Sequence, residues 1–250
     1  MDNNTSIQSS SNNQKHAFYW TGELDQNFWG HIMEEIYKSQ IYKPYLPAKK
    51  EGSVVLEIGA NVGLVTEYFS RHFEKVIALE PSSETFENLS LLVKGGMVTE
   101  NETGKFIELP PLSNVTIVKK ALFIENGEFM FGGPDNNKTM KSLHMATWQD
   151  GKPEEKVETI TCDKLFEDYK IEHVNLMKID IEGSEIEVLS SLGFKNVADK
   201  IDIIVGESHQ WAGRHPNQLK EALKFNGFTL TMLPKTNLQD ADVWVATKYA

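Results

Sequence analysis

The sequence has a single cysteine, no long apolar run and few basic residues, and each shortage excludes a class of protein. Cys162 is the only cysteine among 250 residues, so an internal disulfide framework is excluded and a reducing compartment is expected. No run of about eighteen apolar residues occurs, which excludes a membrane-spanning helix. No basic start followed by an apolar centre marks a signal peptide. These features predict a cytoplasmic protein without membrane contact.

Basic residues are outnumbered as well. The chain has 25 Lys and Arg against 36 Asp and Glu, and its formal net charge is −11. A nucleic-acid surface needs clustered Lys and Arg to displace counterions, and here they are scattered. We therefore expect no nucleic-acid partner. An acidic chain is compatible with a cationic ligand, although net charge acts mainly on solubility.

The apolar content, 40% of the residues, is enough for one sizeable core. Residues 1–16 are mostly Asn, Ser and Gln and are expected to be a disordered tail, because they bury too little apolar area to offset their ordering entropy. Residues 17–50 are predicted to form a helical cap, with a helix over 26–42 that stops near Pro44. This helix either caps a sheet or forms a lid over a site. Residues 51–250 are predicted to be the main domain.

Short β-rich segments alternate with helical patterns from residue 54 onward. The predicted parallel strands are 54–58, 76–80, 115–118, 175–180 and 202–207. Their apolar, β-branched composition suits strands buried on both faces, and the alternation with helices favours βαβ units. Residues 228–232 and 243–247 read as a hairpin, so the sheet is expected to end with an antiparallel strand. The predicted class is α/β.

Two stretches interrupt this alternation. Residues 94–114 form a polar insertion containing Gly and Pro. Residues 123–158 contain a predicted hairpin, with arms at 128–131 and 157–161 on either side of a turn-rich segment. Loops at the strand ends of such sheets often contact ligands.

A glycine loop stands between the first strand and the first helix, where residues 57–63 read Glu-Ile-Gly-Ala-Asn-Val-Gly. Gly59 and Gly63 permit a tight turn and a close approach of ligand to backbone. A dinucleotide fingerprint needs further glycines at the positions of Asn61 and Leu64, so the spacing that cradles a diphosphate is missing. Glu57 would repel a phosphate and favour a cationic amino group.

Glu80 ends the second strand, where a carboxylate can accept hydrogen bonds from both hydroxyls of a ribose. Ser82 or Ser83 can cap the helix that follows and runs to about Val93, and Ser82 is also a candidate cofactor residue. Together with the glycine loop, Glu80 indicates a nucleoside that carries a positive group in place of a diphosphate.

A third motif, residues 178–185, reads Lys-Ile-Asp-Ile-Glu-Gly-Ser-Glu. Strand alternation puts Lys178 and Asp180 on one face, where they form an ion pair that is either part of the site or purely structural. Ser184 and Glu187 fit a capping box. Helix capping does not explain Asp180 and Glu182, which are therefore candidate catalytic residues.

His209 follows the fifth strand and is either a general base or a satisfied structural residue. Asp180, Glu182 and His209 could also ligate Mg²⁺. No compact ligand motif marks such a site, so no metal ligand is assigned.

At these residues the sequence resembles the FkbM-type methyltransferases. The likeness covers residues 54–209 and rests on the glycine loop, on the Lys-Ile-Asp-Ile-Glu-Gly string and on the Glu207-Ser208-His209 ending. The resemblance implies a Rossmann-like, doubly wound, seven-stranded sheet and S-adenosylmethionine as methyl donor. It also implies O-methylation of a hydroxyl on a sugar or another small molecule.

The resemblance further implies roles for single residues. Four residues would hold the methionine portion of the donor: Glu57, Gly59, Asn61 and Gly63. Glu80 would hold the ribose, and Ala121 falls where the adenine pocket usually lies. Asp180 and Glu182 would face the transferred methyl group, and Asp180, Glu182 or His209 would activate the acceptor.

Two other readings are kept open beside O-methyl transfer. One is a nucleotide-dependent oxidoreductase or epimerase, which the missing glycines disfavour. The other is a non-catalytic module that binds the cofactor as a scaffold. The predicted partner is a small-molecule or glycan acceptor, and no sequence pattern indicates an oligomeric state.

Overall fold

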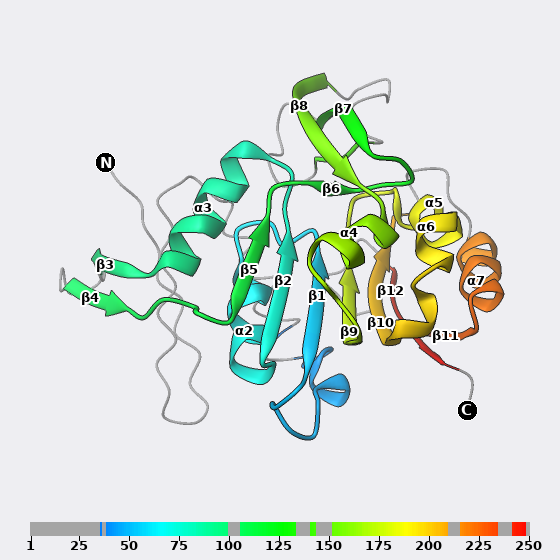
Figure 1. Ribbon diagram of the computed structural model, residues 1–250, viewed down its shortest axis with the longest axis horizontal. Helices are drawn as coiled ribbons and strands as arrows, with labels where there is room; N and C mark the ends of the chain where they lie inside the picture. Colours follow the sequence, from blue (N-terminus) through cyan, green and yellow to red (C-terminus); the bar gives the residue numbers. More distant parts are fainter. Residues whose placement is uncertain are drawn as a thin grey trace.

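The computed structural model describes residues 36, 39–99, 106–133, 141–143, 152–209, 216–234 and 242–248. Seven strands form the central sheet in the order β11-β12-β10-β9-β1-β2-β5 (Figure 1). Their bounds are β1 (Val54–Ile58), β2 (Lys75–Leu79), β5 (Val115–Val118), β9 (Val174–Ile179), β10 (Ile201–Ser208), β11 (Phe228–Met232) and β12 (Asp242–Lys248). The five strands predicted to be parallel are parallel, and the seven-stranded α/β sheet is confirmed.

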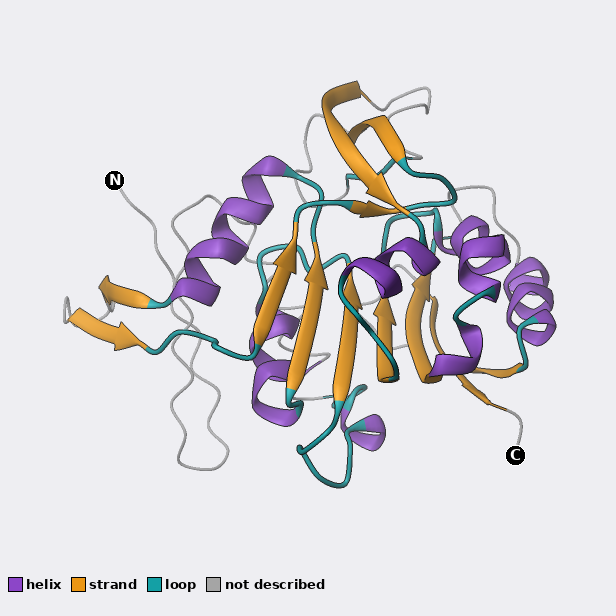
Figure 2. Ribbon diagram, viewed as in Figure 1, coloured by secondary structure: helices purple, strands orange, loops and turns teal. Residues whose placement is uncertain are grey.

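Helices cover both faces of the sheet because the strands are apolar on both faces (Figure 2). On β1, Val55 packs in the core that contains α2 (Leu64–His72) and α3 (Ser83–Lys94), whereas Leu56 packs in the core on the opposite face. That second core contains α4 (Cys162–Asp168), α5 (Glu185–Ser190), α6 (Leu192–Lys195) and α7 (Pro216–Phe225). A short 3₁₀ helix, η4 (Ala198–Lys200), precedes β10.

The C-terminal hairpin is confirmed. β12 is antiparallel to β11 and also to β10, and it lies between them, so β11 forms the edge of the sheet. The chain leaves β1 toward β2 and β5 in one direction, and β9 and β10 lie in the other. Such a reversal of strand order opens a crevice at the carboxyl ends of the strands, where ligands bind in open α/β sheets.

The two insertions form small sheets of their own. The predicted hairpin is confirmed with longer arms, β7 (Gly127–Gly133) and β8 (Lys152–Ile160). β8 also pairs with β6 (Ala121–Leu122), and this three-stranded sheet lies above the carboxyl ends of the central strands (Figure 1). The reading of 94–114 as only a polar insertion was incomplete. It contains an antiparallel pair, β3 (Gly96–Thr99) and β4 (Phe106–Leu109), because both segments are rich in β-forming residues.

Most of the predicted tail and cap, residues 1–16 and 17–50, lies outside the described residues. The end of the helix predicted over 26–42 is wrong, because residues 39–42 form a turn in which Gln40 has φ 51°. A left-handed residue of this kind ends a helix. The 3₁₀ helix η2 (Lys43–Tyr45) follows, and the buried Tyr42 ring packs edge-on against Phe69 of α2 at 5.2 Å.

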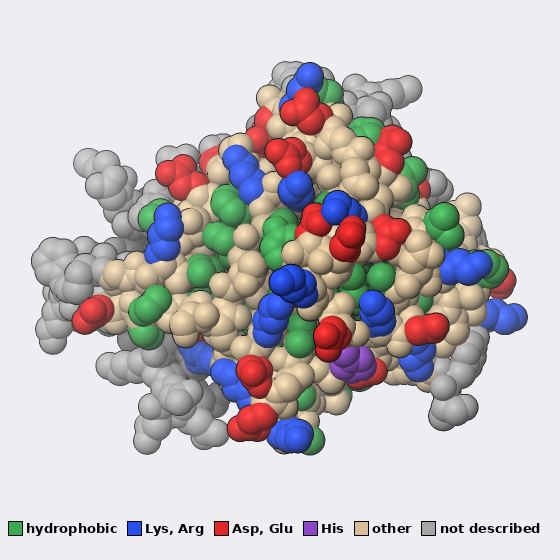
Figure 3. Space-filling model, in the orientation of Figure 1, with side chains coloured by type: hydrophobic (Ala, Val, Ile, Leu, Met, Phe, Trp, Pro, Cys, Tyr) green, Lys and Arg blue, Asp and Glu red, His purple; other side chains and the backbone are tan. Residues whose placement is uncertain are grey.

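The described surface carries both signs of charge. In the view of Figure 3, Lys and Arg side chains are interspersed with Asp and Glu. Within the described ranges, no helix combines the length and the apolar character needed to cross a bilayer.

Candidate active site

The glycine loop is a left-handed turn that ties three strands together. Gly59, Asn61 and Gly63 have φ of 81°, 50° and 93°. The Gly59 and Ala60 N–H groups donate to the carbonyl oxygen of Leu79 at 3.1 and 2.9 Å, which fixes the loop to the end of β2. A Cβ on Gly59 would lie 1.9 Å from the backbone oxygen of Asp180, so only glycine lets the ends of β1 and β9 approach this closely.

Gly63 lies where α2 packs against α3. A Cβ there would lie 2.7 Å from Leu89 Cδ1 and 2.8 Å from Leu92 Cδ2, both on α3. This glycine therefore permits α2 and α3 to pack closely, and it is not among the residues that line the cavity described below.

Glu57 lies beneath the loop and is fully buried. Its Oε2 accepts a hydrogen bond from Thr66 Oγ1 at 2.7 Å, while Oε1 accepts none. Burial raises the pKa of Glu57 to about 7, against the opposing effects of Lys178 and Thr66. Because Glu57 does not line the cavity, its predicted contact with the donor stays a prediction.

Glu80 joins the loop to the start of α3. Its carboxylate accepts hydrogen bonds from Asn61 N–H at 2.8 Å, from Ser82 N–H at 2.9 Å and from Thr85 Oγ1 at 2.7 Å. Burial raises the pKa of Glu80, and these hydrogen bonds oppose the rise. Ser82 occupies the predicted N-cap position, but its side chain makes no capping bond.

A cavity that opens to solvent lies between this loop and Phe131 of β7. Of the residues predicted to form the site, these line it: Gly59, Asn61, Glu80, Ser82, Ala121, Asp180 and Glu182. The Asn61 Oδ1 and Ser82 Oγ atoms are screened from solvent and have no hydrogen-bond partner. Both are polar groups that a bound ligand would satisfy.

No sequence pattern indicated the apolar part of the cavity wall. Leu122, Phe131 and Leu143 give it an apolar surface, and Lys141 lies beside them. Phe131 lies in the hairpin arm predicted over 128–131, but the local sequence of that arm does not indicate what it covers. Lys141 pairs with Glu154 of β8 at 2.6 Å, which ties this cavity residue to the hairpin.

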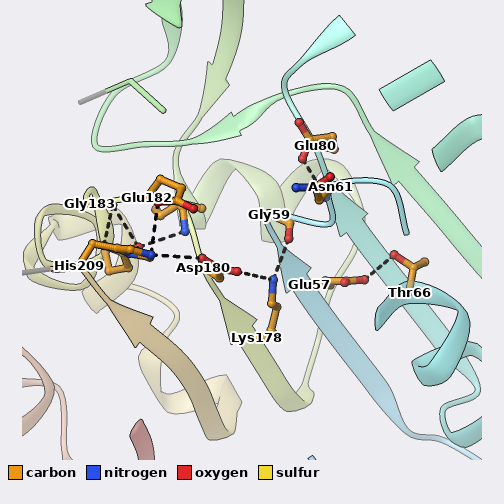
Figure 4. Close-up of polar contacts among 12 residues, drawn as sticks. Glu57, Gly59, Asn61, Thr66, Glu80, Lys178, Asp180, Glu182, Gly183 and His209 are labelled. Atoms are coloured by element: carbon orange, nitrogen blue, oxygen red, sulfur yellow. Dashed lines mark hydrogen bonds and ion pairs between the residues drawn. The ribbon is translucent and has the colours of Figure 1, made fainter. Parts of the chain in front are cut away.

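The predicted Lys178–Asp180 ion pair is confirmed. Lys178 Nζ lies 3.2 Å from Asp180 Oδ2 and donates to the Gly59 carbonyl at 2.8 Å (Figure 4). Burial lowers the pKa of Lys178, but attraction to Asp180 and Glu57 outweighs it and holds the pKa above its usual range. The pair lies at the site, because both residues line the cavity.

The predicted capping box at Ser184 is wrong, because that side chain makes no capping bond. Glu185, the first residue of α5, instead accepts hydrogen bonds from the preceding turn, from the N–H groups of Ile181 at 3.0 Å and Gly183 at 3.1 Å. The tight turn after β9, in which Glu182 has φ 55°, leaves these N–H groups pointing at the Glu185 carboxylate. Glu185 Oε1 also lies 2.9 Å from His209 Nδ1.

Asp180, Glu182 and His209 come together at the edge of the cavity (Figure 4). His209 Nε2 lies 3.4 Å from Glu182 Oε2 and 3.8 Å from Asp180 Oδ1. His209 itself is buried and does not line the cavity. We call these three residues the acidic–histidine cluster.

The cluster perturbs the pKa values of its members. Burial lowers the pKa of His209, but the hydrogen bond to Glu185 and the attraction of Glu182 raise it to about 10. Burial raises the pKa of Glu182 to about 8, against the pull of His209. For Asp180, Lys178 and His209 outweigh burial and keep the pKa below its usual value. The cluster therefore stabilises positive charge at the position of Nε2.

A family model described as the methyltransferase FkbM domain matches residues 57–230. The chain belongs to the FkbM methyltransferase family. Family membership confirms the prediction of an S-adenosylmethionine-dependent methyltransferase, and it decides against the oxidoreductase or epimerase reading.

Two relatives of this chain are also named as methyltransferases. The chain is 24% identical to the methyltransferase sdnD of Sordaria araneosa, with 86% of each chain covered. It is also 24% identical to the hexuronic acid methyltransferase AglP of Haloferax volcanii, with 74% of this chain and 67% of that protein covered.

Solved structures of methyltransferases are similar to this member of the FkbM family. The magnesium protoporphyrin IX methyltransferase ChlM of Synechocystis PCC 6803 has a TM-score of 0.48 at 11% identity, covering 92% of this chain and 88% of that one. The protein SMU.1697c of Streptococcus mutans, solved in complex with SAH, has a TM-score of 0.47 at 10% identity, covering 86% of this chain and 97% of that one.

Proposed function

We propose that this FkbM-family methyltransferase transfers a methyl group to a hydroxyl oxygen of a small molecule or sugar. The observation that carries the proposal is the position of the acidic–histidine cluster. Asp180 and Glu182 line the cavity beside the glycine loop, so groups able to receive a proton adjoin the place where the donor would be held. Oxygen acceptors need such groups because a hydroxyl becomes a better nucleophile as it loses its proton.

The cavity residues fit S-adenosylmethionine in chemical character. Asn61 Oδ1 offers an unused acceptor to the methionine amino group, and the loop backbone at Gly59 permits close approach. Glu80, already ordered by three donors, would accept the ribose hydroxyls. Ala121 and Phe131 supply apolar surface for adenine. Glu57 and Gly63 support the loop from below rather than from within the cavity.

The donor, when bound, supplies a methyl group on a positively charged sulfur that the acceptor oxygen displaces in line. The protein then has to place the acceptor and accept its proton. Positioning alone lowers such a barrier by about 7–11 kcal/mol. Asp180 is held in place by Lys178, which is anchored on the Gly59 carbonyl. The acceptor's proton leaves to the acidic–histidine cluster.

A sugar is a reasonable acceptor class because one relative is named as a hexuronic acid methyltransferase. The test is transfer from methyl-labelled S-adenosylmethionine to a panel of sugars, uronic acids and small alcohols, with NMR locating the new methyl group. Methylation on a hydroxyl oxygen supports the proposal. Methylation only on nitrogen, carbon or a carboxylate would overturn it. Donor binding without transfer to any member of a broad panel would favour the scaffold reading.

A further inference from the structure

We propose that the acidic–histidine cluster is a binding site for one divalent transition-metal cation, with Mn²⁺ the best match to its ligands. Asp180, Glu182 and His209 each offer one ligand atom, and the three atoms lie within 4.8 Å of one another. Neighbouring ligands of an ion bound at about 2.1 Å lie roughly 3 Å apart. The separations of 3.4 and 3.8 Å from His209 Nε2 are therefore close to those of a formed site.

A buried oxygen in the cluster lacks a hydrogen bond. Glu182 Oε2 is screened from solvent and accepts none. It points at His209 Nε2, as Figure 4 shows. A buried carboxylate oxygen is costly unless it is hydrogen-bonded, paired or bound to a metal, and here its contact is the 3.4 Å ion pair with His209, which is too long for a charge-assisted hydrogen bond. A cation between Glu182 and His209 would satisfy this oxygen.

His209 is already oriented as a metal ligand would be. Glu185 Oε1 engages Nδ1 at 2.9 Å, and Glu185 is itself anchored by two backbone N–H groups. This leaves Nε2 directed at the two carboxylates. Metal-ligating histidines almost always donate their second ring N–H to a carboxylate, a carbonyl or water, which sets the tautomer and the ring orientation. Glu185 is thus the positioning residue of the proposed site.

The charges around the cluster favour a cation. Asp180, Glu182 and Glu185 face the Lys178 ammonium, which contacts Asp180 Oδ2 and the Gly59 carbonyl. They also face the His209 ring, which would give up its Nε2 proton to bind a metal. Glu57 and Glu207 also act on Lys178. Carboxylates therefore outnumber the permanent cation in this part of the site, and a divalent ion would offset the excess.

The ligand set also indicates which ion. Mg²⁺ prefers oxygen ligands and water, whereas imidazole suits transition metals. One imidazole with two carboxylates suits Mn²⁺ and leaves coordination positions for water and an acceptor oxygen. A coordinated hydroxyl loses its proton more easily. This catalytic role rests on the proposed O-methylation, whereas cation binding itself rests only on the geometry.

Mn²⁺ binding tests the site without any turnover. The chelator-treated full chain is titrated with Mn²⁺, and the EPR signal of the free ion reports binding. We expect saturable binding of about one Mn²⁺ per chain. Asp180→Asn, Glu182→Gln and His209→Ala should each weaken it more than about tenfold, and Glu185→Gln by about 10–100-fold. Asp202→Asn is the matched control, because Asp202 pairs with His173 at 2.8 Å in an exposed carboxylate–histidine pair, and it should not change binding.

Two results would overturn the site: no saturable binding up to about 1 mM Mn²⁺, or binding that these four substitutions leave unchanged. Circular dichroism and urea unfolding show that each variant is folded, and Glu182→Gln offers a milder change than His209→Ala. Mn²⁺ binding without oxygen methylation would keep the site and defeat the proposed function. Oxygen methylation that survives chelation in a chain without Mn²⁺ binding would do the reverse.

Discussion

The Lys178 ammonium donates to the carbonyl oxygen of Gly59 at 2.8 Å and links β9, which Asp180 directly follows, to the loop that borders the cavity. The same ammonium pairs with Asp180 at 3.2 Å. One buried cation therefore sets the position of a candidate catalytic carboxylate relative to the candidate donor site. A change at Lys178 should therefore affect both the position of Asp180 and the binding of the donor.

Lys178→Met should weaken donor binding and destabilise the fold together. Removing one partner of a buried ion pair leaves the other uncompensated and costs about 3–5 kcal/mol. Urea unfolding and calorimetric titration with S-adenosylmethionine measure the two effects. Lys164→Met is the control, since Lys164 forms an exposed pair with Asp168, and it should alter neither quantity much. Full donor affinity in the Lys178 variant would show that the link is not needed.

Gly59→Ala should be far more damaging than Gly52→Ala. Both glycines have positive φ, 81° and 76°, so both substitutions carry the left-handed penalty of about 1–2 kcal/mol. Only at Gly59 does the new Cβ meet backbone, 1.9 Å from the Asp180 oxygen, whereas nothing lies within 4 Å at Gly52. Thermal unfolding of both variants checks this. Equal losses would mean that the loop relaxes freely away from β9.

Glu80→Gln should abolish discrimination between ribose and deoxyribose. If the carboxylate accepts the ribose hydroxyls, the wild-type chain binds S-adenosylhomocysteine more tightly than its 2′-deoxy analogue. A glutamine would satisfy fewer of the Asn61, Ser82 and Thr85 donors and would accept less strongly. Calorimetry on both ligands and both proteins gives a double-mutant cycle. A coupling near zero would place the ribose elsewhere.

Asp180→Asn should slow turnover while S-adenosylmethionine still binds. The substitution keeps the shape but removes a charge next to the acceptor, and loss of such a group typically lowers kcat by about 10²–10⁴-fold. Single-turnover kinetics with saturating donor measure the step, and calorimetry measures donor affinity. Unchanged turnover would remove Asp180 from the chemistry.

The wild-type chain should lose stability between pH 4.5 and 7 because of Glu57. Burial raises its pKa in the fold from 4.5 to about 7, so over this range the unfolded chain has released a proton that the folded chain still holds. Stability therefore falls as pH rises, by about 3 kcal/mol in total. The loss levels off above pH 7, once the folded chain also releases this proton.

Glu57→Gln should remove that loss. Urea unfolding of both proteins at pH 5 and pH 8 makes the comparison, in which contributions from other groups cancel. Glu51→Gln, at an exposed position, is the control and should follow the wild type. Parallel stability curves for wild type and Glu57→Gln would contradict the assignment of the slope to Glu57.

The local sequence pattern was enough to predict the central sheet and the candidate site residues that follow its strands. Alternating apolar strands and helices predicted five parallel strands and a C-terminal hairpin, because a strand buried on both faces must be apolar throughout. Asn61, which stands where a dinucleotide-binding loop has its second glycine, argued against a diphosphate ligand. The hairpin at 96–109 and the end of the helix before Gln40 were not predicted, since short strands and turns depend on contacts beyond the local window.

What the sequence by itself determined is which residue types follow each strand, and hence the family and its methyl donor. Only the tertiary structure decided which of those residues meet. His209 is 24 positions from Glu185 along the chain yet 2.9 Å away, and Glu57 turns out to lie beneath the cavity. The physical reason is that strand order and register bring the ends of β9 and β10 together. Hydrogen bonds between the residues that follow these two strands depend on this pairing, so they cannot be predicted from the sequence of either segment alone.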